Sequence, residues 1–230
     1  MSQRDTVLVY VGANQGNSLS ELYDKFDKVY AFEPDPEMFS TLKSRFDQFK
    51  WVSLINSACS DYDGESKLYV TPNRVSSSLA DASEEEKSME GFSQSVFKVV
   101  DIKVVNLAKF LESEGVKVID FYYSDCQGSD LTVLKTLKKN FITPNKINQM
   151  FIETHGNGIE IYDGLNNQFK EFKKLLSNNF NFIHASLGSQ NGRIVKEDEI
   201  PEGEKEWDSY WENKEWVEYS IIWLVIRSLT

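Results

Sequence analysis

The sequence predicts an α/β protein with a Rossmann-like fold, in which helices cover both faces of a mainly parallel central sheet. Short apolar segments alternate with amphipathic ones along most of the 230 residues, which is the pattern of repeated βαβ units. A glycine-rich turn follows the first apolar segment, and an acidic residue, Glu33, follows the second. The last two predicted strands have no long helical segment between them, so we expect a terminal antiparallel strand.

The first half of the chain begins with a β-branched, apolar segment at 6–11, which predicts a buried parallel strand that ends at Gly12. A helix is expected over 18–26, a second strand over 29–32, and a helix over 36–46 that begins at a proline. A third strand over 51–56 and a short extra strand over 66–70 follow.

In the second half, ordered structure resumes at 99–105. Helices are expected over 107–114, 131–137 and 165–176, and strands over 118–123, 150–153, 182–185 and 219–226. We expect one domain over residues 1–230, with a loop insert at 71–98 and an acidic, aromatic insert at 186–217. The loop insert lacks periodicity and could act as a lid.

Charge and composition exclude several classes of partner. The formal net charge of −11 opposes binding to polyanionic nucleic acid. No apolar segment approaches the ~20 residues of a membrane-spanning helix, and the first residues do not form a secretory signal. Cys59 and Cys126 show no disulfide or zinc spacing. We therefore expect a cytoplasmic protein without a membrane span or nucleic-acid partner.

The turn after the first strand contains Gly12, Ala13 and Gly16, small residues that let the backbone approach a ligand. Its Gly-x-x-x-Gly spacing differs from the G-x-G-x-x-G of dinucleotide enzymes, and a turn adapted only to packing is equally consistent with it. Glu33 follows about twenty residues later, where an acid can accept hydrogen bonds from both hydroxyls of a ribose. Together the two features favour a cofactor that contains ribose.

Several longer stretches resemble the FkbM family of methyltransferases. The similar segments are 11–17 (VGANQGN), 30–36 (YAFEPDP), 56–61 (NSACSD), 76–79 (SSSL), 119–135 and 152–153. The resemblance implies a Rossmann-like methyltransferase fold that binds S-adenosylmethionine, and O-methylation of sugar or polyketide hydroxyls. The chain differs from the family at Tyr10, where an aspartate is usual, and at Gln127, where a glutamate is usual.

The resemblance also implies which residues hold the cofactor. The glycine-rich turn would border its methionine end, Glu33 its ribose, and Ser57 with Ala58 its adenine. The expected cofactor-binding residues are Gly12, Ala13, Asn14, Gly16, Asn17, Ser18, Phe32, Glu33, Pro34, Asp35, Ser57, Ala58 and Asp125.

Asp125, Glu153 and His155 follow the predicted strands 118–123 and 150–153 and are the candidate catalytic residues. Methyl transfer to an alcohol requires an aligned acceptor and a group that takes the hydroxyl proton. We expect His155 or Asp125 as this base and Glu153 as an orienting group. His155 could instead satisfy backbone groups in a turn, and Asp125 could act only as a helix N-terminal acid. The three residues could also hold a divalent metal, although no metal is predicted.

Trp207 and Trp211 in the second insert are expected to share one helical face. They could cover a sugar ring, although packing of the insert onto the sheet is the favoured interpretation. The sequence and the family resemblance thus predict an S-adenosylmethionine-dependent O-methyltransferase that acts on a sugar or glycan hydroxyl. We expect it to be either a minimal enzyme or a domain of a larger glycan-processing chain. The alternatives are an inactive S-adenosylmethionine-binding module and a methyltransferase for non-sugar small molecules. A nicotinamide dehydrogenase is disfavoured by the glycine spacing.

Overall fold

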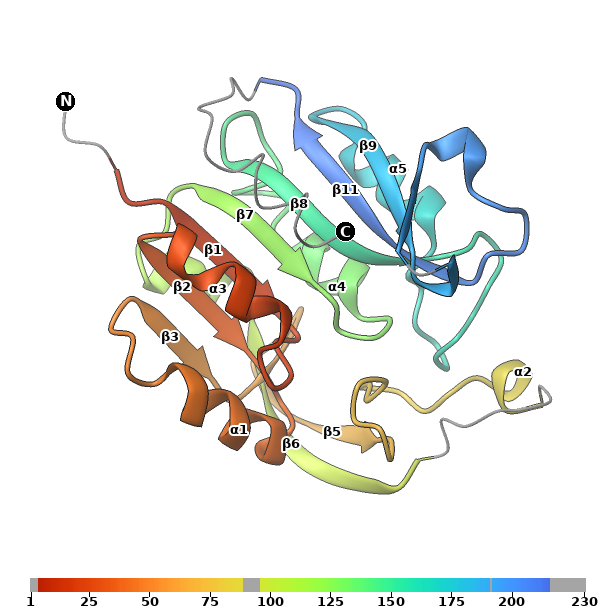
Figure 1. Ribbon diagram of the computed structural model, residues 1–230, viewed down its shortest axis with the longest axis horizontal. Helices are drawn as coiled ribbons and strands as arrows, with labels where there is room; N and C mark the ends of the chain where they lie inside the picture. The colour runs from red at the N-terminus through yellow and green to blue at the C-terminus, as the bar shows by residue number, and fades with distance from the viewer. Residues whose placement is uncertain (1–3, 89–95, 191, 216–230) are drawn as a thin grey trace.

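A computed structural model describes residues 4–88, 96–190 and 192–215 and has an eight-stranded sheet at its centre (Figure 1). The strand order is β10-β9-β11-β8-β7-β1-β2-β3. Strands β3, β2, β1, β7 and β8 are parallel, and β11 is antiparallel to both of its neighbours, β8 and β9. The predicted fold class, a mainly parallel sheet with helices on both faces, is confirmed, and β11 provides an antiparallel strand in it.

The strands of this sheet are β1 (Val7–Val11), β2 (Lys28–Phe32), β3 (Val52–Ile55), β7 (Ile119–Ser124), β8 (Ile147–His155), β9 (Phe180–Leu187), β10 (Arg193–Val195) and β11 (Glu206–Asn213). All five residues of β1 and all six of β7 are buried, as expected of central parallel strands.

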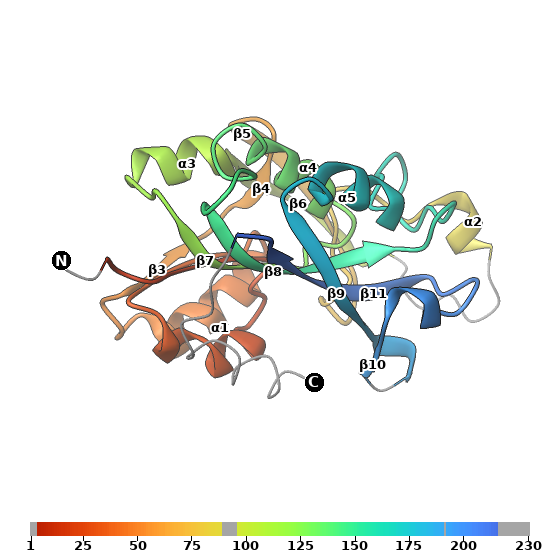
Figure 2. The same ribbon diagram turned by 90° about the horizontal axis from the view of Figure 1, so that it is seen from above.

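Helices cover the two faces of the sheet as separate layers (Figure 2). Helix α1 (Pro36–Phe46) and the 3-10 turns η1 (Ser18–Glu21) and η2 (Tyr23–Lys25) pack on one face. Helices α3 (Leu107–Ser113), α4 (Asp130–Thr136) and α5 (Phe169–Leu176) pack on the other. None of the helices in the described ranges combines the length and apolar character needed to cross a bilayer.

A second, three-stranded sheet adjoins the end of β3. It consists of β4 (Ala58–Ser60), β6 (Lys98–Asn106) and β5 (Gly64–Val70), in that order, and buries its own small apolar cluster around Leu68 and Val104. Beyond β5 the chain continues into the segment 71–88, which contains the short helix α2 (Glu84–Lys87). The remaining 3-10 turns are η3 (Gly188–Gln190), which precedes β10 in the chain, and η4 (Glu197–Glu199), which follows it.

Two predicted helices are shorter than expected. The segment 18–26 forms η1 and η2. Leu19 in η1 and Leu22, the residue between the two turns, are buried three residues apart, the spacing that a 3-10 turn places on one side. Helix α5 begins at Phe169 instead of residue 165 because Asn167 uses its side chain to bind the backbone of Leu131 and Glu153. These bonds hold the preceding residues in a non-helical conformation.

The segment 186–217, expected as an insert outside the sheet, contributes β10 and β11. The prediction that Trp207 and Trp211 share a helical face is wrong, because both lie on strand β11. Residues four apart share a face in a strand as well, and both indoles pack against Phe169, with ring centroids 5.6 and 5.9 Å apart. Both indoles are buried in the core, but the segment joins the sheet as a strand and does not pack onto it as an insert. The strand expected at 219–226 lies outside the described residues, and β11 occupies the antiparallel position predicted for it.

Candidate functional site

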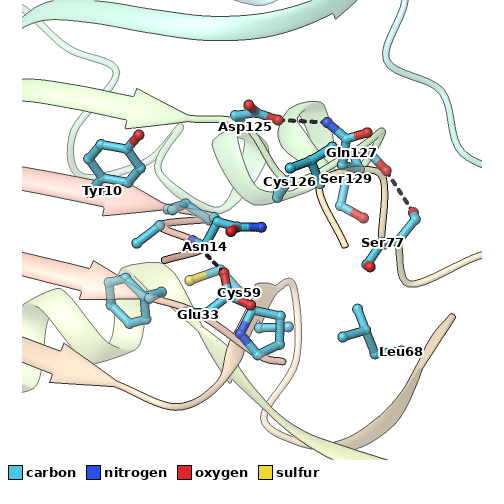
Figure 3. A pocket seen from close by; sticks show the side chains of 18 of the residues that line it. Tyr10, Asn14, Glu33, Cys59, Leu68, Ser77, Asp125, Cys126, Gln127 and Ser129 are labelled. Atoms are coloured by element: carbon cyan, nitrogen blue, oxygen red, sulfur yellow. Dashed lines mark hydrogen bonds between the residues drawn. The ribbon is translucent and has the colours of Figure 1, made fainter. Parts of the chain in front are cut away.

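A cavity opens at the carboxyl ends of β1, β2 and β7 (Figure 3). Here β1 lies between β2 and β7, so the loops that follow the three strands meet at one edge of the sheet. The second sheet contributes Cys59 and Leu68 to the wall, and the segment 74–79 covers one side. The cavity therefore lies where ligands bind in open α/β sheets.

The turn after β1 passes very close to the end of β7. Gly12 has a φ of +82°, and a Cβ at this position would lie 1.8 Å from the backbone carbonyl oxygen of Asp125. Gly16, with a φ of +84°, faces away from the cavity, and its Cβ would clash with Leu42 and Phe46 of α1. Gly12 thus shapes the cavity, whereas Gly16 allows α1 to pack.

The carboxylate of Glu33 is held at the end of β2 by two backbone donors. The N–H of Asn14 donates to its Oε2 (2.6 Å) and the N–H of Asp35 to its Oε1 (2.7 Å). Burial raises the pKa of Glu33 to about 7, although both donors act in the opposite direction. Each oxygen keeps a lone pair for a further donor, so the group can accept bonds from a vicinal diol.

The cavity wall beside β1 carries hydroxyl groups. Tyr10 lines it and stacks on Tyr123, with ring centroids 4.2 Å apart. Burial raises the pKa of the Tyr10 phenol, which therefore stays neutral. The hydroxyl of Ser129 is buried in the wall and has no hydrogen-bond partner among the described residues. A ligand could supply that partner.

The segment 71–79 closes over the cavity and is held on both sides. Arg74 forms ion pairs with Asp35 (2.7 Å) and Glu37 (2.5 Å), and its carbonyl oxygen accepts from the side chain of Asn14 (3.1 Å). On the opposite side, the Ser78 hydroxyl donates to the carbonyl oxygen of Gln127 (2.6 Å). The segment is therefore bound to the loops after both β1 and β7.

The structure brings most of the predicted cofactor-binding residues into one place. Those that line the cavity are Gly12, Ala13, Asn14, Asn17, Ser18, Phe32, Glu33, Pro34, Ser57, Ala58 and Asp125. Gly16 does not line it, for the packing reason given above. Asp35 does not line it either, because its carboxylate caps α1 by accepting from the N–H of Glu37 and pairs with Arg74.

Two of the three candidate catalytic residues are joined at this edge. The Gln127 side-chain amide donates to Asp125 Oδ1 and to Glu153 Oε1, each over 2.7 Å, and its carbonyl oxygen accepts from the Tyr162 hydroxyl (2.5 Å). Asp125 lines the cavity, and burial raises its pKa to about 7, with a smaller contribution from the charge of Asp130. Glu153 does not line the cavity, but it is hydrogen-bonded to Gln127, which does.

His155 does not line the cavity. Its side chain is fully buried, with Nε2 3.9 Å from Glu153 Oε2, and burial lowers its pKa to about 4. Neither ring nitrogen has a hydrogen-bond partner within the described part of the chain. The alternative in which this imidazole satisfies backbone groups is therefore wrong.

Sequence reasoning missed two acids on β11. Asp208 lies opposite Glu153 and Glu206 lies opposite His155 in the antiparallel pair of β8 and β11. Burial raises the pKa of Asp208 to about 8. Among the residues that the structure describes, the ligand atoms of Glu153, His155 and Glu206 lie within 4.8 Å of one another. This set of potential metal ligands differs from the expected one by Glu206 in place of Asp125. The sequence signal that could have revealed them is the alternation of Glu206 and Asp208 with the apolar Trp207, which is typical of a strand.

Comparison with known proteins gives a family match. Residues 11–188 match the model described as the methyltransferase FkbM domain. The structure is similar to that of an FkbM methyltransferase from Methylobacillus flagellatus KT, with a TM-score of 0.51 and 13% identity. The match covers 90% of this chain and 43% of that protein, so this chain spans less than half of its length.

Two further solved structures are more distant. A TehB-like SAM-dependent methyltransferase from Corynebacterium glutamicum has a TM-score of 0.43 and 11% identity, over 93% of this chain and 83% of that one. Aeropyrum pernix fibrillarin with bound S-adenosyl-L-methionine has a TM-score of 0.44 and 12% identity, over 90% and 66%. No curated protein matches the chain.

Proposed function

The chain belongs to the FkbM methyltransferase family, and from this premise we propose that it is an S-adenosylmethionine-dependent O-methyltransferase acting on a hydroxyl of a sugar or glycan. The observation that carries the proposal is the Glu33 carboxylate, held by Asn14 and Asp35 in a cavity at the carboxyl ends of the parallel strands. Such a group suits the ribose of an adenosyl cofactor.

The lining of the cavity fits this cofactor. Glu33 would accept from the ribose hydroxyls, and Ser57 with Ala58 would border the adenine. Gly12 leaves room for a ligand next to the end of β7. Tyr10 is neutral, so it offers the cofactor a hydroxyl where the family's usual aspartate would offer a carboxylate.

When bound, S-adenosylmethionine supplies an electrophilic methyl group. The residues of the chain must then orient the acceptor oxygen in line with that methyl and take its proton. Asp125 is the base that the geometry supports best, since it lines the cavity and has a pKa near neutrality. Gln127 positions it by donating to Oδ1.

A polyhydroxylated acceptor fits the polar groups beside Asp125. Gln127, Ser77 and Ser129 line the cavity with amide and hydroxyl groups, and such groups can bind several hydroxyls of a sugar at once. The net charge of −11 disfavours a nucleic-acid acceptor. Both cysteines are free, which is consistent with the cytoplasmic location that we also propose.

Calorimetry with S-adenosylhomocysteine tests the cofactor assignment. We expect one site per chain, and saturation at 100 times Kd should add about 2.7 kcal/mol and raise Tm by roughly 5–10 °C. Glu33→Ala should abolish the heat, whereas Glu65→Ala, on the exposed part of β5, should not. The absence of heat with the unaltered protein would exclude the proposal.

Methyl transfer itself separates the enzyme from an inactive module. The chain should be incubated with methyl-labelled S-adenosylmethionine and panels of sugars, oligosaccharides and non-sugar alcohols. Label in a sugar supports the proposal, and label only in a non-sugar alcohol supports the alternative substrate class. Binding of the cofactor without transfer to any acceptor would favour the inactive module.

A further inference from the structure

The pairing of β8 with β11 gathers acidic groups around one imidazole. Residues directly opposite each other in an antiparallel pair point to the same face, so Glu206 and Asp208 lie on the same face as His155 and Glu153. Glu153, Glu206 and Asp208 thus place three carboxylates on this face. A cation placed among these carboxylates would offset their mutual repulsion.

His155 lacks the partners that a buried imidazole needs. Its side chain has no solvent exposure, and both ring nitrogens lack a hydrogen bond to any described residue. An unsatisfied buried polar group costs about 1–3 kcal/mol, so such a group requires an explanation. The neutral imidazole has a free lone pair next to the carboxylate of Glu153, which is the form in which histidine binds metals.

We propose that Glu153, His155 and Glu206 form a binding site for one divalent transition-metal ion such as Mn²⁺. Their ligand atoms lie within 4.8 Å of one another, and His155 Nε2 lies 3.9 Å from Glu153 Oε2. Ligands at about 2.0–2.2 Å from one ion are separated by roughly 3–4 Å, so small side-chain rotations complete the site. One imidazole with two carboxylates favours a transition metal over Mg²⁺ or Ca²⁺, which prefer oxygen ligands alone.

The site has a route from solvent. Glu206 lines a second cavity with Pro201, Gly203 and Lys205. Lys205 is a cation in this lining, but its ammonium group is paired with both carboxylate oxygens of Glu86, each over 2.9 Å. An ion can therefore reach Glu206 from this cavity, and three protein ligands leave coordination positions for water or a substrate oxygen.

The site is connected to the cofactor cavity through Gln127, which bonds both Glu153 and Asp125. An acceptor hydroxyl on the ion would lose its proton to Asp125 more readily, because a bound metal lowers the pKa of its oxygen ligands. This role rests on the proposed function, whereas binding of the ion does not.

Binding of Mn²⁺ to the chelator-treated full chain tests the site. Calorimetry and electron paramagnetic resonance should show one ion per chain. The expected loss of affinity is at least tenfold in Glu206→Gln and complete in His155→Asn. The control variant Glu202→Gln removes an exposed carboxylate from the same second cavity and should bind Mn²⁺ as the unaltered chain does.

Pulsed resonance of the bound Mn²⁺ should also show nitrogen coupling from the imidazole, which Glu202→Gln retains. No bound ion, no nitrogen coupling, or unchanged affinity in Glu206→Gln would each overturn the site. Glu206 is exposed, so this variant keeps the test valid even if His155→Asn does not fold. Mn²⁺ binding is measured without cofactor, and S-adenosylhomocysteine binding without metal, so failure of this site is distinguishable from failure of the proposed function.

Discussion

The side-chain amide of Gln127 lies 2.7 Å from Asp125 Oδ1 and uses the same nitrogen to bind Glu153. It therefore separates two carboxylates that would otherwise repel each other. In Gln127→Glu a third carboxylate takes its place, and we expect a loss of about 1–3 kcal/mol of stability at pH 8, together with lower turnover. Urea denaturation measures the loss. Gln48→Glu adds the same charge at an exposed position and should leave stability nearly unchanged.

Gly12→Ala should destabilise the chain much more than Gly115→Ala. Both glycines have positive φ, +82° and +73°, so both substitutions cost about 1–2 kcal/mol in backbone strain. Only at Gly12 does the new Cβ meet backbone, whereas nothing lies within 4 Å at Gly115. Urea denaturation should therefore show the larger loss for Gly12→Ala, which should also bind S-adenosylhomocysteine weakly. Equal losses would mean that the β1 turn is not closely packed.

Glu33 should make stability depend on pH. Burial raises its pKa from the ordinary 4.5 to about 7, so its favourable contribution is fully present below pH 4.5 and is lost as pH rises through 7. Glu33→Gln removes this dependence, and its free energy of unfolding, relative to that of the unaltered chain, should rise between pH 4.5 and 7. Glu65→Gln on β5 is the control. A parallel pH dependence of Glu33→Gln and the unaltered chain would contradict the assignment.

Arg74→Met should weaken binding of S-adenosylhomocysteine about tenfold, a loss of about 1.4 kcal/mol. The substitution removes the ion pairs that hold the segment 71–79 against Asp35 and Glu37, and it leaves the carboxylate of Asp35 buried without its cation. Calorimetry gives the Kd. Arg193→Met, at an exposed position of β10, should have no effect, and an equal effect there would argue against a covering role for the segment.

The rate of methyl transfer should increase with pH through about 7. Asp125 must be ionised to accept the hydroxyl proton, and burial raises its pKa to about 7. The kcat/KM of the acceptor, measured from pH 5.5 to 8.5, should therefore follow one ionisation. Asp125→Asn should lower kcat at least about 100-fold while S-adenosylhomocysteine still binds. Undiminished turnover in Asp125→Asn would remove it from the chemistry.

The position of the cofactor cavity could be predicted from the sequence because it depends on local order. The turn at Gly12 and the acid at Glu33 each follow a short apolar strand, and neighbouring parallel strands place their carboxyl ends at one edge. Asp125 ends β7, the other neighbour of β1, by the same rule. The alternation of strands and helices thus determined the fold class and most of the cavity lining.

The surroundings of His155 and Glu153 were decided only by the tertiary structure. Their partners Glu206 and Asp208 are about fifty residues away, and only the antiparallel register of β11 with β8 places them opposite. Periodicity identified Trp207 and Trp211 as one apolar face but did not show that the element is a strand. Burial of His155 is likewise a property of the packed molecule, because it depends on which segments cover the ring. Local pattern therefore determines where chain segments end, whereas long-range pairing determines which charges face one another.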